Sequence, residues 1–192
     1  MGKLLCDPSV RARDRVKCFP WPPGSALAFL HVKGVEQKDT KTCSLSNSVE
    51  AGMATVVVKR VVDSGSVGAG DIGVIMPYEA QTSLIKAMLQ SESLGDVEAA
   101  NIDVFQGREH EVIDVSFVRS NSGGRLGHVD DGRRLNVAFT RAKRGFGRHW
   151  RQGHLKIRIR KWAHLFYDKS FRVRSCDRNA SKSTTSSIST PR

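Results

Sequence analysis

The sequence has few of the features that would place it in a membrane or outside the cell. Its 192 residues contain no apolar run of about 18 residues, the length that a transmembrane helix needs. The N-terminal stretch MGKLLCDPSVRARDRVK has no apolar segment of the kind found in secretory signals. Four cysteines are scattered along the chain without a C-x-x-C pair, so neither a zinc knuckle nor a redox motif is indicated. We expect an intracellular protein with reduced thiols.

Excess positive charge is missing from most of the chain, although the formal net charge is +12. Residues 1–143 hold 18 basic and 17 acidic side chains, whereas residues 144–192 hold 13 and 2. The charge therefore belongs to the C-terminal part and says little about what the rest binds.

Composition divides the chain into three segments. Residues 1–24 include three prolines in FPWPPG, which forbid a regular helix or a central strand and predict an irregular, extended segment. Residues 25–145 carry the regular apolar patterns of one domain. Residues 146–192 form a basic, aromatic tail whose Ser/Thr-rich end SKSTTSSIST is expected to be disordered.

Short apolar runs alternate with helical patterns through residues 25–145. The predicted elements are strand 26–32, a helix from Asn47, strand 72–76 ended by Pro77, helix 79–90, strands 100–105 and 112–118, and helix 130–144. Residues 36–46 are polar and are predicted to form a loop. This alternation predicts an α/β domain with a mostly parallel, helix-covered sheet.

Each predicted helix has an apolar stripe and end signals. Asn47 or Ser48 can cap the first helix, and Glu50 follows Asn47 in capping-box spacing. In the last helix, Asp131 lies near the start and Lys143 and Arg144 near the end, where each charge suits the helix dipole. The predicted stripes are Val49, Met53, Val56, Val57, Arg60 and Val61, then Ala80, Leu84, Ala87 and Met88, then Leu135, Ala138, Phe139 and Ala142.

Three stretches combine these elements with polar residues. They are IGVIMPYEAQ (72–81), NIDVFQGREHEVIDVSFVRSN (101–121) and RRLNVAFTRAKRG (133–145). In order and spacing they resemble motifs four, five and six of superfamily-1B helicases of the nonsense-mediated-decay and senataxin type. The resemblance covers about residues 18–145. It implies a RecA-like, P-loop NTPase-type second motor domain of an ATP-dependent helicase, with single-stranded RNA or DNA as a partner in the nucleus or cytoplasm.

Two arginines of the third stretch are candidates for phosphate chemistry. Arg134 and Arg141 are seven residues apart and would lie close to one helical face, while Arg133 points elsewhere. A guanidinium on a rigid helix can stabilise charge that develops on a γ-phosphate across a domain cleft. By resemblance, Arg141 is the arginine finger and Arg134 a supporting contact. A solvated basic helix face is the plain alternative.

The second stretch has the residues of a phosphate-approaching turn. Gly107 lets backbone amides come close to a ligand, Gln106 and Arg108 can bond phosphate or ribose, and Glu109 can accept from a sugar hydroxyl or hold an arginine. The resemblance implies that this turn couples ATP to the nucleic acid, with Gly107, Arg108 and Glu109 on the ATP side and Gln106 on the nucleic-acid side. An ordinary polar turn remains the alternative.

In the first stretch, Tyr78 and Gln81 follow a strand end and are predicted to face the nucleic acid. Two positions depart from the family. Met76 stands where relatives usually have threonine, and no arginine lies near Ser48.

The parts that grip ATP are absent. The sequence has no G-x-x-x-x-G-K-[ST] and no Asp-Glu pair after an apolar strand, so we expect ATP with Mg²⁺ only when a first RecA-like domain completes the site. The chain alone is not expected to hydrolyse ATP, and it is interpreted as truncated at both ends, since its residues after Gly145 depart from the apolar strand of relatives.

Two alternatives stay open. One is a non-enzymatic product that binds nucleic acid through its basic tail, with Trp150, Trp162, Phe166 and Tyr167 available to stack. The other is an inert fragment that folds poorly.

Overall fold

A computed structural model describes residues 16–19, 27–40, 42–125, 127–150 and 174–175. In this part of the chain one sheet has the strand order β5-β4-β6-β7-β1-β8, and every neighbouring pair is parallel. Its strands are β1 (Leu27–His31), β4 (Ile72–Met76), β5 (Glu98–Asn101), β6 (His110–Ser116), β7 (Ala142–Trp150) and β8 (Arg174–Ser175). The prediction of a parallel α/β sheet is confirmed. Residues 1–15 and most of the tail lie outside the described residues.

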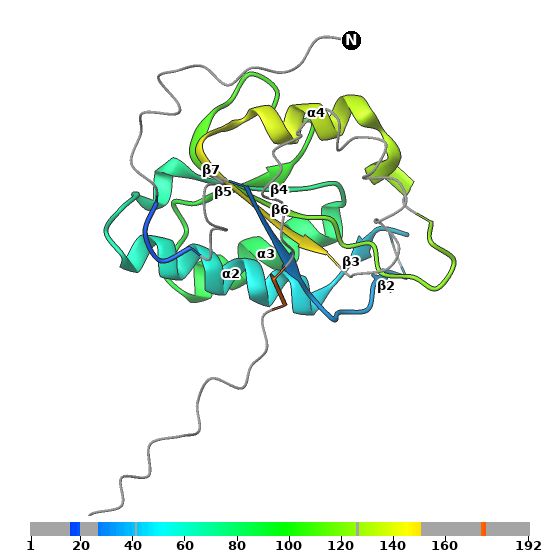
Figure 1. Cartoon of the computed structure of the whole chain (residues 1–192). Coiled ribbons are helices and arrows are strands. Elements are labelled where there is room, and N and C mark those ends of the chain that lie inside the picture. The colour runs from blue at the N-terminus through cyan, green and yellow to red at the C-terminus, as the bar shows by residue number, and fades with distance from the viewer. Residues whose placement is uncertain (1–15, 20–26, 41, 126, 151–173, 176–192) are drawn as a thin grey trace, which may run out of the picture.

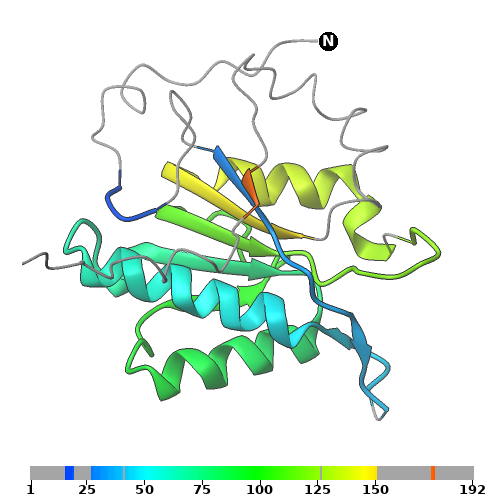
Figure 2. The same cartoon turned by 60° about the horizontal axis from the view of Figure 1, so that its bottom comes forward.

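Helices cover both faces of the sheet (Figures 1 and 2). Helices α2 (Ser48–Asp63) and α3 (Glu79–Ser91) lie on one face, and α4 (Gly132–Thr140) lies on the other. Strand β4 is buried along its whole length between these layers, which explains its nearly continuous apolar sequence. The core accordingly forms two clusters, one around Val58, Ile72 and Ile85 and one around Ile75, Phe105 and Ile113. Within the described residues, no helix is long and apolar enough to cross a membrane.

Helix α2 begins as predicted but buries a different stripe. Asn47 is its N-cap and accepts from the Glu50 amide at 3.2 Å. The predicted stripe was partly wrong, because Val49 and Val56 are 39% and 46% exposed. The helix packs against both α3 and the strands β6 and β7, so its buried face is wider and rotated. The buried residues are Glu50, Ala51, Ala54, Thr55, Val57, Val58 and Val61.

Helix α3 also rotates relative to the prediction. It buries Gln81, Thr82, Ile85 and Leu89, whereas Ala87 of the predicted stripe is exposed and Leu84 is half-buried. The helix therefore turns polar side chains inward at its first turn, where they form hydrogen bonds with neighbouring elements. Strand β5 ends at Asn101, and the residues predicted as strand up to Phe105 form turns instead.

The predicted helix over residues 130–144 was wrong at its C-terminal end. Asp131 caps α4 by accepting from the Arg133 amide at 2.9 Å, but the helix ends at Thr140 and Arg141 is its C-cap. Ala142, Lys143 and Arg144 begin β7, which pairs with β6 on one side and β1 on the other. The parallel ladder with β6, in which Ala142 pairs with His110, thus overrides the local helical pattern. Strand β7 runs on to Trp150, so the predicted domain end at residue 145 falls inside it.

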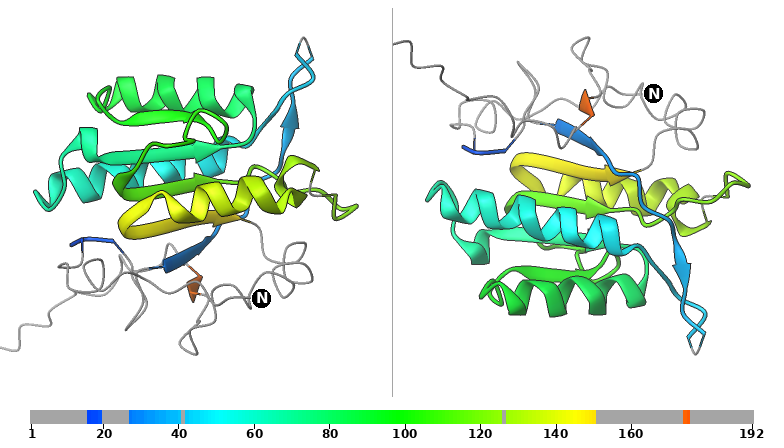
Figure 3. Two further views of the ribbon diagram at one scale, coloured as in Figure 1. Left: turned by 90° about the horizontal axis from the view of Figure 1, so that it is seen from above. Right: turned by 90° about the horizontal axis from the view of Figure 1, so that it is seen from below.

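A short hairpin extends from the carboxyl end of β1. Strands β2 (Gln37–Lys38) and β3 (Leu45–Ser46) pair antiparallel within the segment predicted as a loop. The hairpin projects beyond the sheet at that end (Figure 3). Among the described contacts of the hairpin, Ser44 Oγ accepts from the Ala80 amide at 3.1 Å, which ties it to the first turn of α3.

Two glycines are expected to respond in opposite ways to alanine. A Cβ at Gly73 in β4 would lie 2.7 Å from Ile113 Cδ1 and 2.8 Å from Phe105 Cε1, so Gly73→Ala should destabilise the domain by about 1–3 kcal/mol. A Cβ at Gly52 inside α2 meets nothing within 4 Å, so Gly52→Ala should stabilise it by about 0.5–1 kcal/mol. Urea unfolding midpoints measure both changes. Shifts of the two midpoints in the same direction would contradict this packing.

Candidate functional site

Most of the predicted site residues lie at one of two ends of the parallel sheet. We call them the amino edge, where the strands begin, and the carboxyl edge, where the strands end. Residues 106–109 directly precede β6, and Arg141 directly precedes β7, so both groups lie at the amino edge. The strands pair with His110 opposite Ala142, and the His110 amide donates to the Arg141 carbonyl at 3.1 Å. Glu109 and Arg141 are therefore neighbours at one edge. Tyr78 and Gln81 follow β4 and lie at the opposite, carboxyl edge.

Arg141 has a side chain that is still available for an anionic ligand. Its backbone is helical, with φ −86° and ψ −16°. Its guanidinium Nε and Nη2 donate to Thr140 Oγ1 at 3.3 and 3.0 Å. Within the part of the chain that the structure describes, no carboxylate lies within ion-pair distance of this guanidinium. A neutral hydroxyl holds the group in place without neutralising it.

The turn before β6 is open to solvent. Gly107 has φ +79°, a backbone conformation that favours glycine. Gln106, Arg108 and Glu109 are exposed. Arg108 forms an ion pair with Glu98, while Glu109 Oε2 lies 3.9 Å from Lys143 Nζ.

Glu98 also links this turn to the start of β6. Its Oε2 lies 2.9 Å from His110 Nε2, and His110 packs against Phe105 with ring centroids 5.6 Å apart. Contacts with Glu98 of β5 and with Phe105 of the core therefore hold the end of the turn at His110, while Gln106 and Gly107 stay exposed.

Arg134 does not lie beside Arg141. Seven residues separate them along α4, which corresponds to about 10 Å of helix. Its Nε and Nη2 donate to the two carboxylate oxygens of Asp103 at 3.1 and 3.0 Å, and Nη1 contacts His128 Nδ1 at 3.0 Å. This bidentate pair ties α4 to the end of β5 and occupies the side chain that was predicted to support a phosphate.

The carboxyl edge holds Tyr78 as predicted, but Gln81 turns inward. Tyr78 is only 8% exposed; its hydroxyl accepts from Arg119 Nη1 at 3.3 Å and its ring meets His128 edge-on. Gln81 is fully buried. Its amide accepts from the Asn47 amide at 2.8 Å and donates to the Asn47 carbonyl and to Ser116 Oγ at 3.2 and 3.0 Å. The predicted nucleic-acid contact of Gln81 is therefore wrong, because the side chain joins elements inside the domain.

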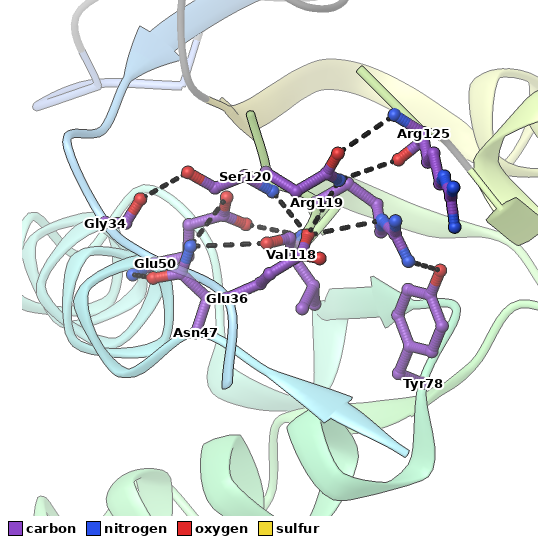
Figure 4. Close-up of polar contacts among 10 residues, drawn as sticks. Gly34, Glu36, Asn47, Glu50, Tyr78, Val118, Arg119, Ser120 and Arg125 are labelled. Carbon is purple, nitrogen blue, oxygen red and sulfur yellow. Dashed lines mark hydrogen bonds and ion pairs between the residues drawn. The ribbon is translucent and has the colours of Figure 1, made fainter. Parts of the chain in front are cut away.

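A second set of residues at this edge was missed by the sequence analysis (Figure 4). Glu36 Oε2 accepts from the Ser120 amide at 2.7 Å and from Asn121 Nδ2 at 3.2 Å, and lies 3.3 Å from Arg119 Nε. Ser120 Oγ donates to the Gly34 carbonyl. Segment 34–36 thus binds three consecutive residues after β6. No local sequence pattern indicated these contacts, because the hydrogen-bonded residues lie 84 to 86 positions apart.

Among the residues that the structure describes, no group of three or more His, Cys, Asp or Glu side chains is placed to hold a metal ion.

Comparison with known proteins gives this arrangement a family. A protein-family profile described as an AAA domain matches residues 1–147. The chain is 38% identical over 151 residues to "Regulator of nonsense transcripts 1" from Dictyostelium discoideum, and 39% identical over 131 residues to "DNA replication ATP-dependent helicase/nuclease DNA2" from Mus musculus. The chain belongs to the superfamily-1 helicases.

The helicase matches cover most of this chain and a small part of each relative. They span 75% of this chain and 11% of the Dictyostelium protein, and 65% of this chain and 12% of the mouse protein. "DNA-binding protein SMUBP-2" from Rattus norvegicus is 41% identical over 110 residues, which are 57% of this chain and 11% of that protein. The chain therefore spans about a tenth of the relatives that it matches, and the family resemblance inferred from motifs four to six is confirmed.

Proposed function

We propose that this chain acts as the second motor domain of an ATP-dependent helicase and supplies Arg141 to an ATP site completed by a first RecA-like domain. One observation supports this proposal most strongly. Strand pairing between β6 and β7 brings Glu109 and Arg141 to the same edge, and Arg141 has no carboxylate partner in the described part of the domain.

The proposed roles at the amino edge follow from charge and reach. Arg141 stabilises the negative charge that develops on the γ-phosphate during transfer to water. Glu109 accepts from a sugar hydroxyl, and the open turn at Gly107 lets the backbone approach the nucleotide. Arg108 shares this edge but is paired with Glu98. Mg²⁺ would arrive with ATP, with ligands from the first domain.

The carboxyl edge is the proposed contact surface for single-stranded RNA or DNA. We define it by Tyr78, Arg119, Arg125 and His128, which surround the strand end of β4 and the segment after β6. Arg125 and His128 are exposed and can reach phosphate oxygens. Gln106, at the other edge, stays a prediction. Such a domain would work inside the cell, in the nucleus or cytoplasm.

Turnover measured in trans tests this proposal. The 192-residue chain alone should show background ATP hydrolysis with or without single-stranded RNA, because its sequence contains no phosphate-cradling loop. Adding a first RecA-like domain from one of the relatives should give RNA-stimulated hydrolysis. Turnover by the chain alone, or none from any such pair, would contradict the proposal.

A second candidate function, RNA binding by the basic tail, is supported by the charge distribution of the sequence. Deleting residues 151–192 separates the two candidates. It spares β7, which ends at Trp150, and of the described strands it removes only the two-residue edge strand β8. If RNA binding disappears and the in-trans hydrolysis loses its RNA stimulation, the tail and not the carboxyl edge is the binding element. If both survive the deletion, the tail candidate is wrong.

A further inference from the structure

Val118 has a backbone conformation that valine rarely adopts. Its φ is +68°, in the left-handed region where a β-branched side chain is a genuine outlier. The residue is also completely buried. It lies two positions beyond the end of β6, where the chain leaves the sheet. Something in the surrounding structure must hold this conformation in place.

Side chains at the start of α2 stabilise this conformation of Val118. The Val118 amide donates to Glu50 Oε2 at 2.8 Å, and the Val118 carbonyl accepts from Asn47 Nδ2 at 3.3 Å. Both backbone polar groups are thus bonded by side chains rather than by a neighbouring strand (Figure 4). Glu50 Oε2 also accepts from Ser116 Oγ at 2.7 Å.

Glu50 is more than a helix cap. In a capping box the Glu at this position would accept from the N-cap amide, but here the Asn47 amide donates to Gln81 instead. The Glu50 carboxylate, fully buried, is therefore directed at the segment after β6. A buried carboxylate is tolerated only where donors surround it, and these donors come from residues 47, 116 and 118.

The backbone conformation of Val118 sets the direction in which the chain continues to Arg119. Alternation along β6 sends Val112 and Ser116 to the α2 face and Ile113 and Val115 to the α4 face. Because Val118 is left-handed, the chain does not continue as a strand. The next residue, Arg119, lies against Tyr78 Oη at 3.3 Å and Glu36 Oε2 at 3.3 Å.

We propose that Glu50 is a positioning residue for the nucleic-acid surface: by holding Val118 in the left-handed conformation, it fixes Arg119 on Tyr78 and sets the geometry of the carboxyl edge. We call the hydrogen bonds from Glu50 and Asn47 to the Val118 backbone the clamp. The clamp follows from the contacts above, while its role in nucleic-acid contact rests on the proposed function. Glu50 touches no ligand and acts only through the backbone of residues 118–120.

Limited trypsin digestion of the full chain tests the clamp directly. Arg125 lies in an exposed loop, whereas the side chain of Arg119 is only 12% exposed, so wild-type protein should be cut after Arg125 long before Arg119. Glu50→Met keeps the side-chain length but removes both acceptors. Cleavage after Arg119 should accelerate by about tenfold or more, because the strained conformation of Val118 then lacks the acceptor that holds it and the open form is favoured.

Val118→Gly in the Glu50→Met background gives the decisive comparison. Glycine adopts positive φ without strain, so the double variant should again be cut slowly after Arg119. A role of Glu50 in packing alone predicts the reverse, since Val118→Gly also removes a buried side chain. If Glu50→Met does not fold by circular dichroism, Glu50→Gln carries the same comparison. Glu92→Gln, which removes an exposed carboxylate paired with Lys59, is the matched control.

Fluorescence anisotropy with a labelled ten-nucleotide oligouridine completes the test. Glu50→Met should raise the Kd by about threefold or more through loss of ordered phosphate contacts, and Val118→Gly should reverse this. Unchanged cleavage after Arg119 in Glu50→Met, or faster cleavage in the double variant, overturns the clamp. The expected cleavage pattern with an unchanged Kd in every variant overturns the role in RNA contact and the assignment of RNA to this edge.

Discussion

Arg141→Ala should lower RNA-stimulated ATP turnover by about a thousandfold or more when the chain is paired with a first RecA-like domain. An arginine that reaches a transferring phosphoryl group is worth about 10³–10⁵ in turnover. Arg141 is fixed for this task by Thr140 and is free of carboxylates among the described residues. The measurement is steady-state phosphate release at saturating ATP.

Two further variants make the Arg141 test specific. Arg133→Ala removes an exposed arginine from the same helix and should leave turnover within about twofold, because a surface charge far from the phosphate is screened. Arg141→Lys keeps the charge but loses the planar fork, so it should recover little activity. Equal losses in Arg133→Ala and Arg141→Ala would mean that general positive charge, and not a finger, is needed.

Phe105→Ala should reduce the free energy of unfolding by about 3–5 kcal/mol, the usual cost of emptying a buried aromatic site. Phe105 is fully buried in the cluster beneath α4. Its ring lies against His110, and its carbonyl accepts from the Arg108 amide at 3.2 Å. The loss should therefore loosen the turn at Gly107 as well as the core.

The neighbouring residue offers a matched control for Phe105. Val104 is 47% exposed, so Val104→Ala should change stability by about 0.5 kcal/mol or less. Guanidinium titrations followed by circular dichroism measure both variants. A loss below about 1 kcal/mol for Phe105→Ala would show that the ring does not fill the core as described.

Local patterns predicted the elements well where one short-range rule dominates. The apolar run of Ile72, Val74 and Ile75 identified a buried strand, and Asn47 identified the start of a helix. Helix faces were harder, because α2 packs on a helix and on the sheet at once, which left Val49 and Val56 outside.

Strand β7 shows the limit of local prediction most clearly. Ala142, Lys143 and Arg144 were predicted to continue the helix, yet they begin a strand. Ala142 pairs with His110 of β6, and the same strand pairs with β1 from Phe146 onward. The β1 partner lies more than a hundred residues away in sequence, and no local pattern contains that information.

In the candidate site too, features set by local motifs were predicted and features set by residues distant in sequence were not. Motif spacing placed Glu109 and Arg141 in one functional group, and strand pairing brings them to one edge. Gln81 was misjudged because its partners, Asn47 and Ser116, lie 34 and 35 positions away. Glu50 was recognised only as a cap for the same reason, since Val118 lies 68 positions further along.

The central place of β7 has a consequence during synthesis. Leu27 of β1 pairs with Phe146 of β7, so β1 leaves the ribosome long before the strand that joins it to β6 exists. At about 5–20 residues per second, the wait is roughly 6–24 s. Throughout that interval β1 presents open backbone edges, and β6 adds another once residue 116 has emerged. Such edges are templates for pairing with other chains. We expect the nascent polypeptide to depend on chaperones until residue 150 has emerged.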